Sequence, residues 1–253
     1  KEYSSGLEYL SINLKLKKVE TANIKVYKNK KSSFSVIISY KGERTIFVYH
    51  AFEPESFFLP KELKTNWLYL GPMAKGYERI FNQIVSFVVN RNIKVAINPG
   101  AIQIKNGLGS FGGLSRLIEI IFLNREEAQS LSGLPGVPKI KDMAKIINLS
   151  GPKTVVITDG REGAYVYTEN DFFKVGIYPG HRLDATGAGD TFAAGFLAAL
   201  IEGEQLRECL KWGVVNAASV IEKIGAQEGL LKKSVIKKRI QEYRWPAESL
   251  RFS

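Results

Sequence analysis

DATGAGDTFAAGF, residues 184–196, is the stretch in which small residues lead directly into an apolar helical pattern. Gly187, Ala188 and Gly189 are small enough for backbone N–H groups to gather at the helix start, where exposed donors and the helix dipole favour a phosphate. Asp190 then falls in the first turn, where its carboxylate can accept the proton of a hydroxyl that attacks phosphorus. The residues alone also allow a plainer interpretation, in which the glycines make a tight turn and Asp190 caps the helix.

Apolar strands alternate with helical stretches on both sides of this segment. The alternation predicts an α/β fold with a central, mainly parallel sheet and helices on both faces. The sequence contains no internal repeat or low-complexity linker, so one domain over residues 1–253 is expected. The predicted strands are 67–70, 95–98, 120–123, 154–158, 164–167 and 172–177, and the predicted helices are 77–90, 125–131, 141–149, 188–202, 205–224 and 233–243.

Two early segments, 33–40 and 44–49, are rich in Val, Ile, Phe and Tyr and flank the polar turn 41–43. Such residues favour strands, so a hairpin is expected here, within about residues 24–49.

Composition excludes several classes of protein. Lys and Arg number 36 against 25 Asp and Glu, a net charge of +11, but the basic runs are scattered and lack the interleaved aromatics that stack on bases. We therefore expect no nucleic-acid partner, although a basic field also attracts an anionic nucleotide or sugar phosphate. No apolar run approaches the ~18 residues of a membrane span, so no membrane partner is expected. The single cysteine, Cys209, excludes an internal disulfide and a cysteine metal cluster, which fits a reducing cytoplasm.

The whole string 184–196 closely resembles the second signature of the ribokinase-like (PfkB) carbohydrate kinases, with Ala185 where that family usually carries Thr or Ser. The resemblance implies a three-layer α/β/α fold with a small β lid formed by the hairpin, through which relatives often dimerise. It implies that ATP and Mg²⁺ are used, with Asp190 as general base and Gly187, Ala188 and Gly189 as the anion hole.

Other segments match the same family in order along the chain. Asn124-Arg125-Glu126-Glu127 is similar to the family's Asn-x-x-Glu element, which organises magnesium and phosphate, and Glu127 is the carboxylate to test. Residues 155–164 resemble the strand and turn that line the nucleotide site, with Thr158 and Gly160 toward ATP. From the residues alone, Asn124 to Glu127 can also be interpreted as a helix cap with acids in the first turn. Residues 155–164 can likewise be interpreted as a strand that ends in an Asp-Gly turn.

The late part of the chain carries the remaining matches. Asn216, followed by two alanines in a helix, and the pair Gly225 and Ala226 resemble the family's adenine-pocket helix and loop. Relatives often bind a monovalent cation through the first aspartate of the signature, which makes Asp184 and Thr186 candidates for K⁺. Asp184 could equally hold the turn by accepting hydrogen bonds from backbone amides.

Three further observations on the sequence point to no function. Residues 107–112, GLGSFG, satisfy the dinucleotide pattern G-x-G-x-x-G, yet polar residues 103–106 precede them where a buried strand should end. No segment fits the P-loop pattern. The two histidines, His50 and His181, have no partner at metal-ligand or triad spacing, so each is expected to be structural or at the surface.

The resemblance predicts transfer of the γ-phosphoryl group of ATP to a hydroxyl of a sugar such as ribose or fructose, with a nucleoside, as in adenosine-type kinases, as the nearest alternative. A sugar phosphate as acceptor, a nucleotide-binding relative without turnover, and more remotely a nucleic-acid-binding module are the other hypotheses. Family members usually begin with a strand, a sugar-contacting aspartate and a Gly-Gly-x-x-Asn element that are not found here. We therefore expect the given sequence to be incomplete at its N-terminus.

Overall fold

The computed structural model describes residues 14–15, 17–24, 34–40, 43–49, 59–60 and 63–246. The chain divides into two compact units, residues 1–37 with 46–64 and residues 38–45 with 65–253.

A two-stranded sheet is formed by β1 (Phe34–Tyr40) and β2 (Glu43–Tyr49), which confirms the predicted pair of early strands. The rings of Phe34 and Tyr49 meet across the two strands with centroids 5.2 Å apart. Because alternate residues of a strand share a face, Val36 lies on the face of Phe34, and Phe47 on that of Tyr49. These four side chains are 48–58% exposed, so this face of the small sheet is apolar and accessible.

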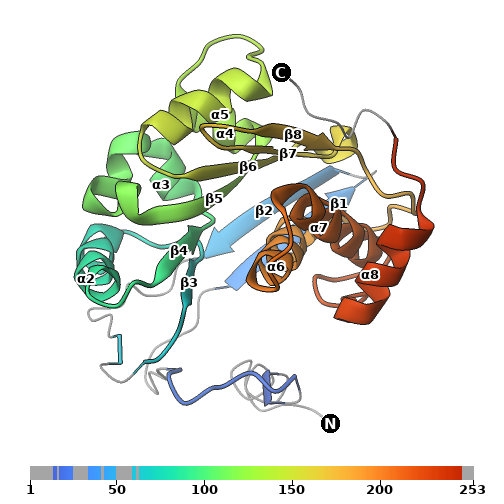
Figure 1. The fold of residues 1–253 in the computed structure, drawn as a ribbon, viewed down its shortest axis with the longest axis horizontal. Coiled ribbons are helices and arrows are strands. Elements are labelled where there is room, and N and C mark those ends of the chain that lie inside the picture. Colours follow the sequence, from blue (N-terminus) through green and yellow to red (C-terminus); the bar gives the residue numbers. More distant parts are fainter. Residues whose placement is uncertain are drawn as a thin grey trace. The chain divides into compact units, whose positions relative to one another are not determined.

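A six-stranded sheet forms the centre of the larger unit, with its strands in sequential order (Figure 1). The first four strands pair in parallel and the last two add antiparallel, as expected for a mainly parallel sheet. The strands are β3 (Trp67–Leu70), β4 (Lys94–Ile97), β5 (Ile118–Asn124), β6 (Thr154–Thr158), β7 (Ala164–Tyr167) and β8 (Phe172–Val175).

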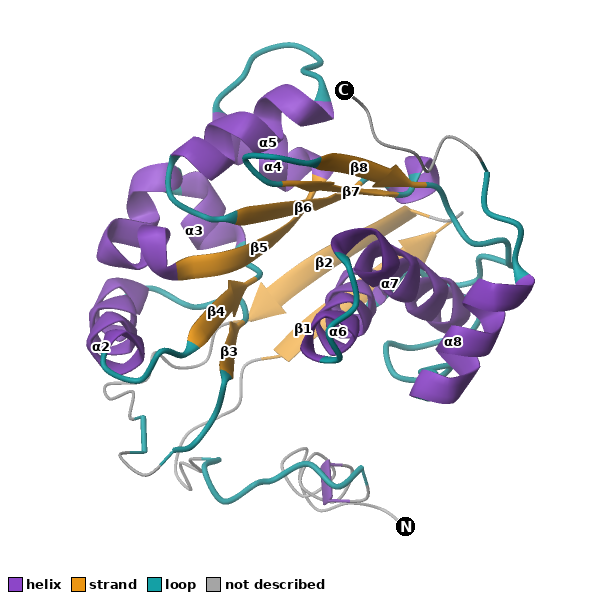
Figure 2. Ribbon diagram, in the orientation of Figure 1, coloured by secondary structure: helices purple, strands orange, loops and turns teal. Residues whose placement is uncertain are grey.

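Helices cover both faces of this sheet, which makes the larger unit a three-layer α/β/α structure (Figure 2). One layer holds α2 (Tyr77–Val89), α3 (Ala101–Lys105), α4 (Arg125–Ser132) and α5 (Ile140–Leu149), and the other holds α6 (Ala188–Ile201), α7 (Leu206–Ile221) and α8 (Lys233–Glu242).

Alternation along the strands divides the core between the two layers. Ile120 and Phe122 of β5 belong with Val156 of β6 to a buried cluster that includes residues of α6 and α7. The intervening residues, such as Ile121 and Val155, are also buried and point to the opposite face because successive side chains of a strand alternate. A sheet buried on both faces accounts for the nearly continuous apolar runs in its parallel strands.

The boundaries of the predicted elements agree with the structure to within one to three residues. The strand expected at 172–177 ends at Val175, and the helix expected at 205–224 ends at Ile221. The sequence did not predict α3, nor the two 3₁₀ segments η1 (Leu108–Leu117) and η2 (Gly160–Glu162). Within the described residues, no helix is long and apolar enough to span a membrane.

The glycine-rich residues 107–112 lie at η1 and follow α3. As predicted, they are therefore not the strand-to-helix turn of a dinucleotide site.

Candidate active site

The start of α6 is a glycine turn with open backbone donors. Gly187 is the N-cap and has φ +76°, a left-handed conformation that suits glycine. A Cβ at this position would lie 2.7 Å from the Cβ of Ala226, so the turn also packs too closely for a side chain. The N–H of Ala188 donates to the carbonyl of Ala185 at 3.2 Å. Among the described residues, no backbone carbonyl accepts from the N–H of Gly189 or Asp190, so these two donors are open to a ligand or to water.

Asp190 is the third residue of α6 and lies in its first turn, as predicted. It is exposed, so a ligand can reach its carboxylate.

A cavity of about 460 Å³ opens beside this helix start. It is lined by Ala188 and Gly189 at the start of α6, by the turn after β6, by the segment between β8 and α6, and by one face of α7. This size and mixed lining suit a small polar ligand with an apolar ring. The residues that line it are Thr158, Gly160, Arg161, Gly163, Ala164, Ile177, Tyr178, Arg182, Leu183, Asp184, Ala185, Ala188, Gly189, Phe192, Val214, Ala217, Ala218 and Ile221.

Tyr69, near the carboxyl end of β3, is electrostatically coupled to Asp190. Burial, and secondly the negative charge of Asp190, raise the pKa of Tyr69 to about 12. The Tyr69 hydroxyl therefore stays protonated at neutral pH and is able to donate a hydrogen bond. The ring of Tyr69 lies 6.5 Å from that of Phe122, and Phe122 meets Phe196 of α6 edge to face at 5.5 Å.

Asp184 holds the turn before α6 together. Its Oδ1 accepts from both the N–H and the hydroxyl of Thr186, at 2.9 and 2.6 Å. Its Oδ2 accepts from the N–H of Gly225 at 3.0 Å, which ties the loop after α7 to the turn. The hydrogen-bonding role that the sequence left open for Asp184 is therefore present, and Gly225 and Ala226 both contact this turn.

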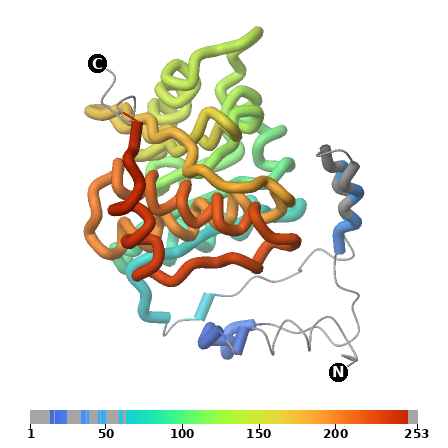
Figure 3. Tube along the Cα trace, turned by 90° about the vertical axis from the view of Figure 1, so that its right-hand side faces the viewer, coloured from blue at the N-terminus to red at the C-terminus, as the bar shows by residue number. Residues whose placement is uncertain are grey.

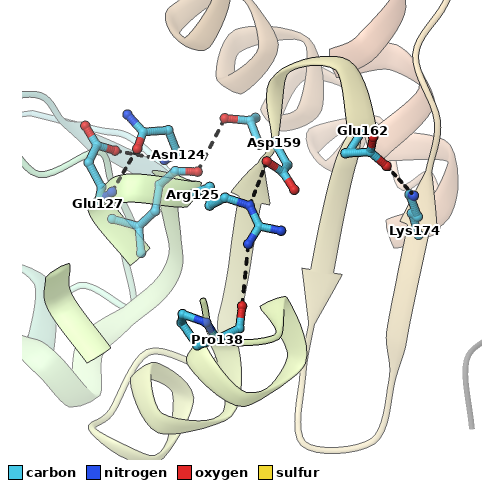
Figure 4. A network of polar contacts seen from close by, with 9 residues as sticks. Asn124, Arg125, Glu127, Pro138, Asp159, Glu162 and Lys174 are labelled. Carbon is cyan, nitrogen blue, oxygen red and sulfur yellow. Dashed lines mark hydrogen bonds and ion pairs between the residues drawn. The ribbon is translucent and has the colours of Figure 1, made fainter. Parts of the chain in front are cut away.

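Asn124 and Glu127 form a reciprocal capping box at the start of α4 (Figure 4). The side chain of Asn124 accepts from the N–H of Glu127, and Oε2 of Glu127 accepts from the N–H of Asn124, both at 2.8 Å. Burial raises the pKa of Glu127, the hydrogen bond from Asn124 lowers it, and the nearby charge of Glu126 raises it, with a net upward shift. The helix-cap interpretation of these residues is thus seen directly, and neither side chain lines the cavity.

An ion pair joins this cap to the turn after β6. Arg125 Nε lies 2.9 Å from Oδ1 of Asp159, and the Arg125 guanidinium also donates to the carbonyl of Pro138 (Figure 4). Thr158, whose hydroxyl donates to the carbonyl of Leu123 at 3.4 Å, adds a second link between β5 and the same turn. Because Thr158 and Gly160 line the cavity, the pair fixes the cavity wall relative to α4.

One face of α7 forms the apolar end of the cavity. Val214, Ala217, Ala218 and Ile221 follow the i, i+3, i+4, i+7 spacing and all line it. Asn216 lies off this stripe and does not line the cavity. Its side-chain amide instead donates to the carbonyl of Thr191 at 3.1 Å and accepts from the N–H of Leu231 at 3.2 Å, both structural contacts.

Several residues of the cavity wall could not be predicted from the sequence. Tyr178, Arg182 and Phe192 lie there, and Tyr69 lies near Asp190. Strand and loop patterns contain no signal for them, because their positions depend on how distant elements pack. Glycine spacing and a helix start were the signals for the residues that were found.

The described residues include no group of three or more His, Cys, Asp or Glu side chains that could hold a metal ion. The carboxylates of Glu127, Asp184 and Asp190 are oxygen donors of the type that Mg²⁺ takes, one or two at a time, beside phosphate oxygens and water.

The chain matches the family model described as "pfkB family carbohydrate kinase" over residues 8–233. The chain belongs to the pfkB carbohydrate kinase family. A cytidine kinase of Thermococcus kodakarensis is 41% identical over 110 residues, which is 43% of this chain and 38% of that protein. A ribokinase of Staphylococcus aureus is 27% identical over 234 residues, 88% of this chain and 74% of that protein.

The fold of this pfkB family member is shared by solved structures. The nucleoside kinase of Methanocaldococcus jannaschii superposes with a TM-score of 0.73 at 19% identity, over 94% of this chain and 77% of that one. The matched stretches of this chain span less than half the length of several curated relatives.

Proposed function

We propose that this protein transfers the γ-phosphoryl group of ATP to a hydroxyl of a sugar, with Asp190 as the general base. The observation that carries the proposal is the cavity that meets the start of α6, where open donors at Gly189 and Asp190 adjoin an exposed carboxylate. Membership of the pfkB family supports it.

In the proposed reaction, the acceptor hydroxyl gives its proton to the Asp190 carboxylate while its oxygen forms a bond to the γ-phosphorus. The bond from that phosphorus to the bridging oxygen breaks, and ADP leaves with the electron pair. The N–H groups at the start of α6, with the helix dipole, stabilise the charge on the transferring group. Placing the reactants and neutralising charge account for most of the rate in this class of reaction.

We assign the nucleotide to the cavity, with its phosphates at Ala188 and Gly189 and its base toward the α7 stripe. Thr158 and Gly160 form the wall between the two ends. Magnesium, when bound, would neutralise part of the phosphate charge, and Glu127 is the carboxylate that we propose would hold it, with Asn124 holding the glutamate in place.

A K⁺ ion beside Asp184 and Thr186 is also part of the proposal. A carboxylate has about four lone-pair sites, so one that accepts hydrogen bonds can still accept a cation.

A nucleoside is the second candidate acceptor. It is favoured by the similarity to a cytidine kinase and to nucleoside kinases. Tyr69, half exposed beside Asp190, provides an aromatic ring on which a nucleobase could stack.

The test is a coupled ADP-release assay with Mg-ATP against ribose, fructose, other hexoses, adenosine, cytidine and other nucleosides. Turnover that depends on a sugar or on a nucleoside supports the kinase and identifies the acceptor class. ATP binding without turnover for any acceptor supports the nucleotide-binding relative that lacks activity. Failure to bind ATP contradicts the proposal.

We propose a second copy of this chain as the partner of the small β1–β2 sheet. The exposed apolar face of Phe34, Val36, Phe47 and Tyr49 supports this, because a contiguous apolar face of this kind is typical of an interface. Light scattering on the parent and on Phe47→Lys tests it, and a parent that stays monomeric at high concentration contradicts it.

A further inference from the structure

Tyr178 contributes an aromatic ring to the same cavity as the α7 stripe. It lies three residues after β8, is half buried, and lines the cavity together with Ala217 and Ala218 of α7. The α7 side of the cavity thus offers small apolar side chains, and Tyr178 offers a flat ring. Such a combination suits a planar heteroaromatic group, because stacking on an aromatic side chain needs no particular hydrogen-bond pattern.

The ring of Tyr178 is held by three residues at the far end of the described chain. The ring of Tyr243 lies 5.0 Å from it and that of Trp245 lies 6.3 Å from it, both tilted. The guanidinium of Arg239 lies over the Tyr178 ring at 6.0 Å. We call Arg239, Tyr243 and Trp245 the C-terminal clasp.

The clasp residues also contact one another and α7. Tyr243 and Trp245 meet edge to face at 4.9 Å, and the indole N–H of Trp245 donates to the carbonyl of Ile240 at 3.2 Å. The ammonium of Lys211 in α7 lies 5.6 Å from the Trp245 ring centre, and an ion pair with Glu208 at 2.6 Å holds that lysine. Each of these contacts restricts the rotation of a ring or of the cation that lies over it.

The helix α8, which contains Arg239 and directly precedes Tyr243 and Trp245, is itself held in place. The side chain of Ile236 is buried, and Lys237 pairs with Glu204 at 3.0 Å. Figure 3 shows this red segment beside the orange helices of the same layer. The described C-terminal residues therefore connect the packing of α8 to one wall of the cavity.

We infer that the C-terminal clasp consists of positioning residues that fix the Tyr178 ring as a stacking wall for the base of the nucleotide. This inference rests on the proposed function and extends it, since it assigns base affinity to residues outside the glycine turn. Tyr178 contacts the base, whereas the clasp acts only through Tyr178. A preorganised ring binds more tightly than a mobile one because less rotational freedom is lost on binding.

The experiment compares two probes, ADP and inorganic tripolyphosphate, by calorimetric titration of the full chain. Tyr178→Ala should weaken ADP binding about 10-fold or more, because base stacking on an aromatic residue has an effect of this order. The double variant Tyr243→Ala with Trp245→Ala should weaken ADP binding about three- to tenfold by loosening the Tyr178 ring. Tripolyphosphate has no base, so both variants should bind it as the parent does.

Conservative variants separate positioning from general damage. Tyr178→Phe and Trp245→Phe keep the rings and should restore ADP binding to near the parent value. Tyr167→Ala removes a half-buried aromatic side chain of β7 that does not line the cavity, and it should leave the ADP affinity unchanged. Trp245→Leu, which keeps an apolar side chain, replaces the double variant if the latter does not fold.

Each outcome decides the inference. Equal losses for ADP and tripolyphosphate, or clasp variants that bind ADP like the parent, overturn it and leave the proposed kinase intact. A parent that binds tripolyphosphate but not ADP also overturns it. A parent that binds neither contradicts the proposed function itself, and the inference falls with it.

Discussion

Oδ2 of Asp184 accepts a hydrogen bond from the N–H of Gly225 at 3.0 Å, across 41 residues of sequence. With the two bonds from Thr186 to Oδ1, this carboxylate joins the turn before α6 to the loop after α7. Both segments border the helix start at which we place the phosphates, so the geometry of that start depends on a contact between distant parts of the chain.

Asp184→Asn should lower the free energy of unfolding by about 1–3 kcal/mol, because the amide has one acceptor oxygen and turns a donor toward one of the three N–H or O–H groups. Denaturant unfolding in choline chloride measures this without potassium. Glu169→Gln, a change at an exposed carboxylate, is the control. A variant as stable as the parent in choline chloride but less stable in KCl would instead assign Asp184 mainly to K⁺.

Gly187→Ala and Gly189→Ala should differ sharply. The first places a Cβ in a left-handed conformation and 2.7 Å from Ala226, so it should destabilise the fold by about 1–3 kcal/mol. The second meets no atom within 4 Å and should leave stability equal or raised. If phosphates occupy the space beside Gly189, this folded variant should still bind ATP more weakly. Thermal unfolding and ATP titration measure both effects, and equal stability losses would refute the distinction.

Asp190→Asn should lower kcat by roughly two to four orders of magnitude, the range for loss of a general base, with ATP affinity largely retained. Stopped assays with the acceptor identified by the panel measure kcat, and calorimetry measures ATP binding. Asp171→Asn, a carboxylate in the turn before β8, is a matched control for the charge change. A variant at Asp190 that turns over like the parent would rule out the assigned role.

Glu127→Gln and Glu127→Ala separate the capping role of this residue from its proposed metal role. Glutamine still completes a capping box, so stability should stay within about 0.5 kcal/mol of the parent, whereas alanine should cost about 1 kcal/mol. Both variants should need more Mg²⁺ for half-maximal rate, because both lack the carboxylate. An unchanged Mg²⁺ requirement in both would remove Glu127 from the metal site.

The pH dependence of stability gives a further check on Glu127. Burial raises its pKa in the folded chain, so the folded state holds this proton more tightly than the unfolded state. The resulting stabilisation is full below the ordinary pKa of a glutamate and declines as the pH rises through the raised value. Unfolding curves across this range should show a smaller decline for Glu127→Gln than for the parent, and identical slopes would contradict the shift.

Cys209 should be inert toward Ellman's reagent at pH 8 in the folded protein. The side chain is fully buried, and burial, with a smaller effect of the charge on Glu204, raises its pKa to about 12. Thiolate is the reactive form, so the thiol should react only when the chain unfolds. Adding denaturant should release one equivalent of the reagent's coloured thiolate per chain. Rapid reaction without denaturant would show that this part of α7 opens.

The order and type of the main elements could be predicted from the sequence because they depend on local patterns. The parallel strands are buried on both faces, so their apolar runs are continuous, and the long helices begin and end at clear polar or glycine positions. The helix α3 was missed because five residues show almost no periodicity, and η1 was missed because its ten residues are rich in glycine and interrupted by a kink at Gly112. The glycine turn at the start of α6 could be predicted because the small residues that it requires stand at consecutive positions.

Which of the predicted residues share a cavity depends on how distant elements pack together. Thr158, Gly160 and Asp184 meet Ala188 and Gly189 there, whereas Asn216 does not, because its place on α7 turns it toward Thr191 and Leu231. The side chains that complete the wall, such as Tyr178 with its C-terminal clasp, come together only when elements far apart in sequence pack against one another. Helix starts and strands follow from neighbouring residues, so the local chemistry can be predicted from the sequence. The site depends on contacts between residues far apart in the chain, and such contacts leave no signature in a single sequence.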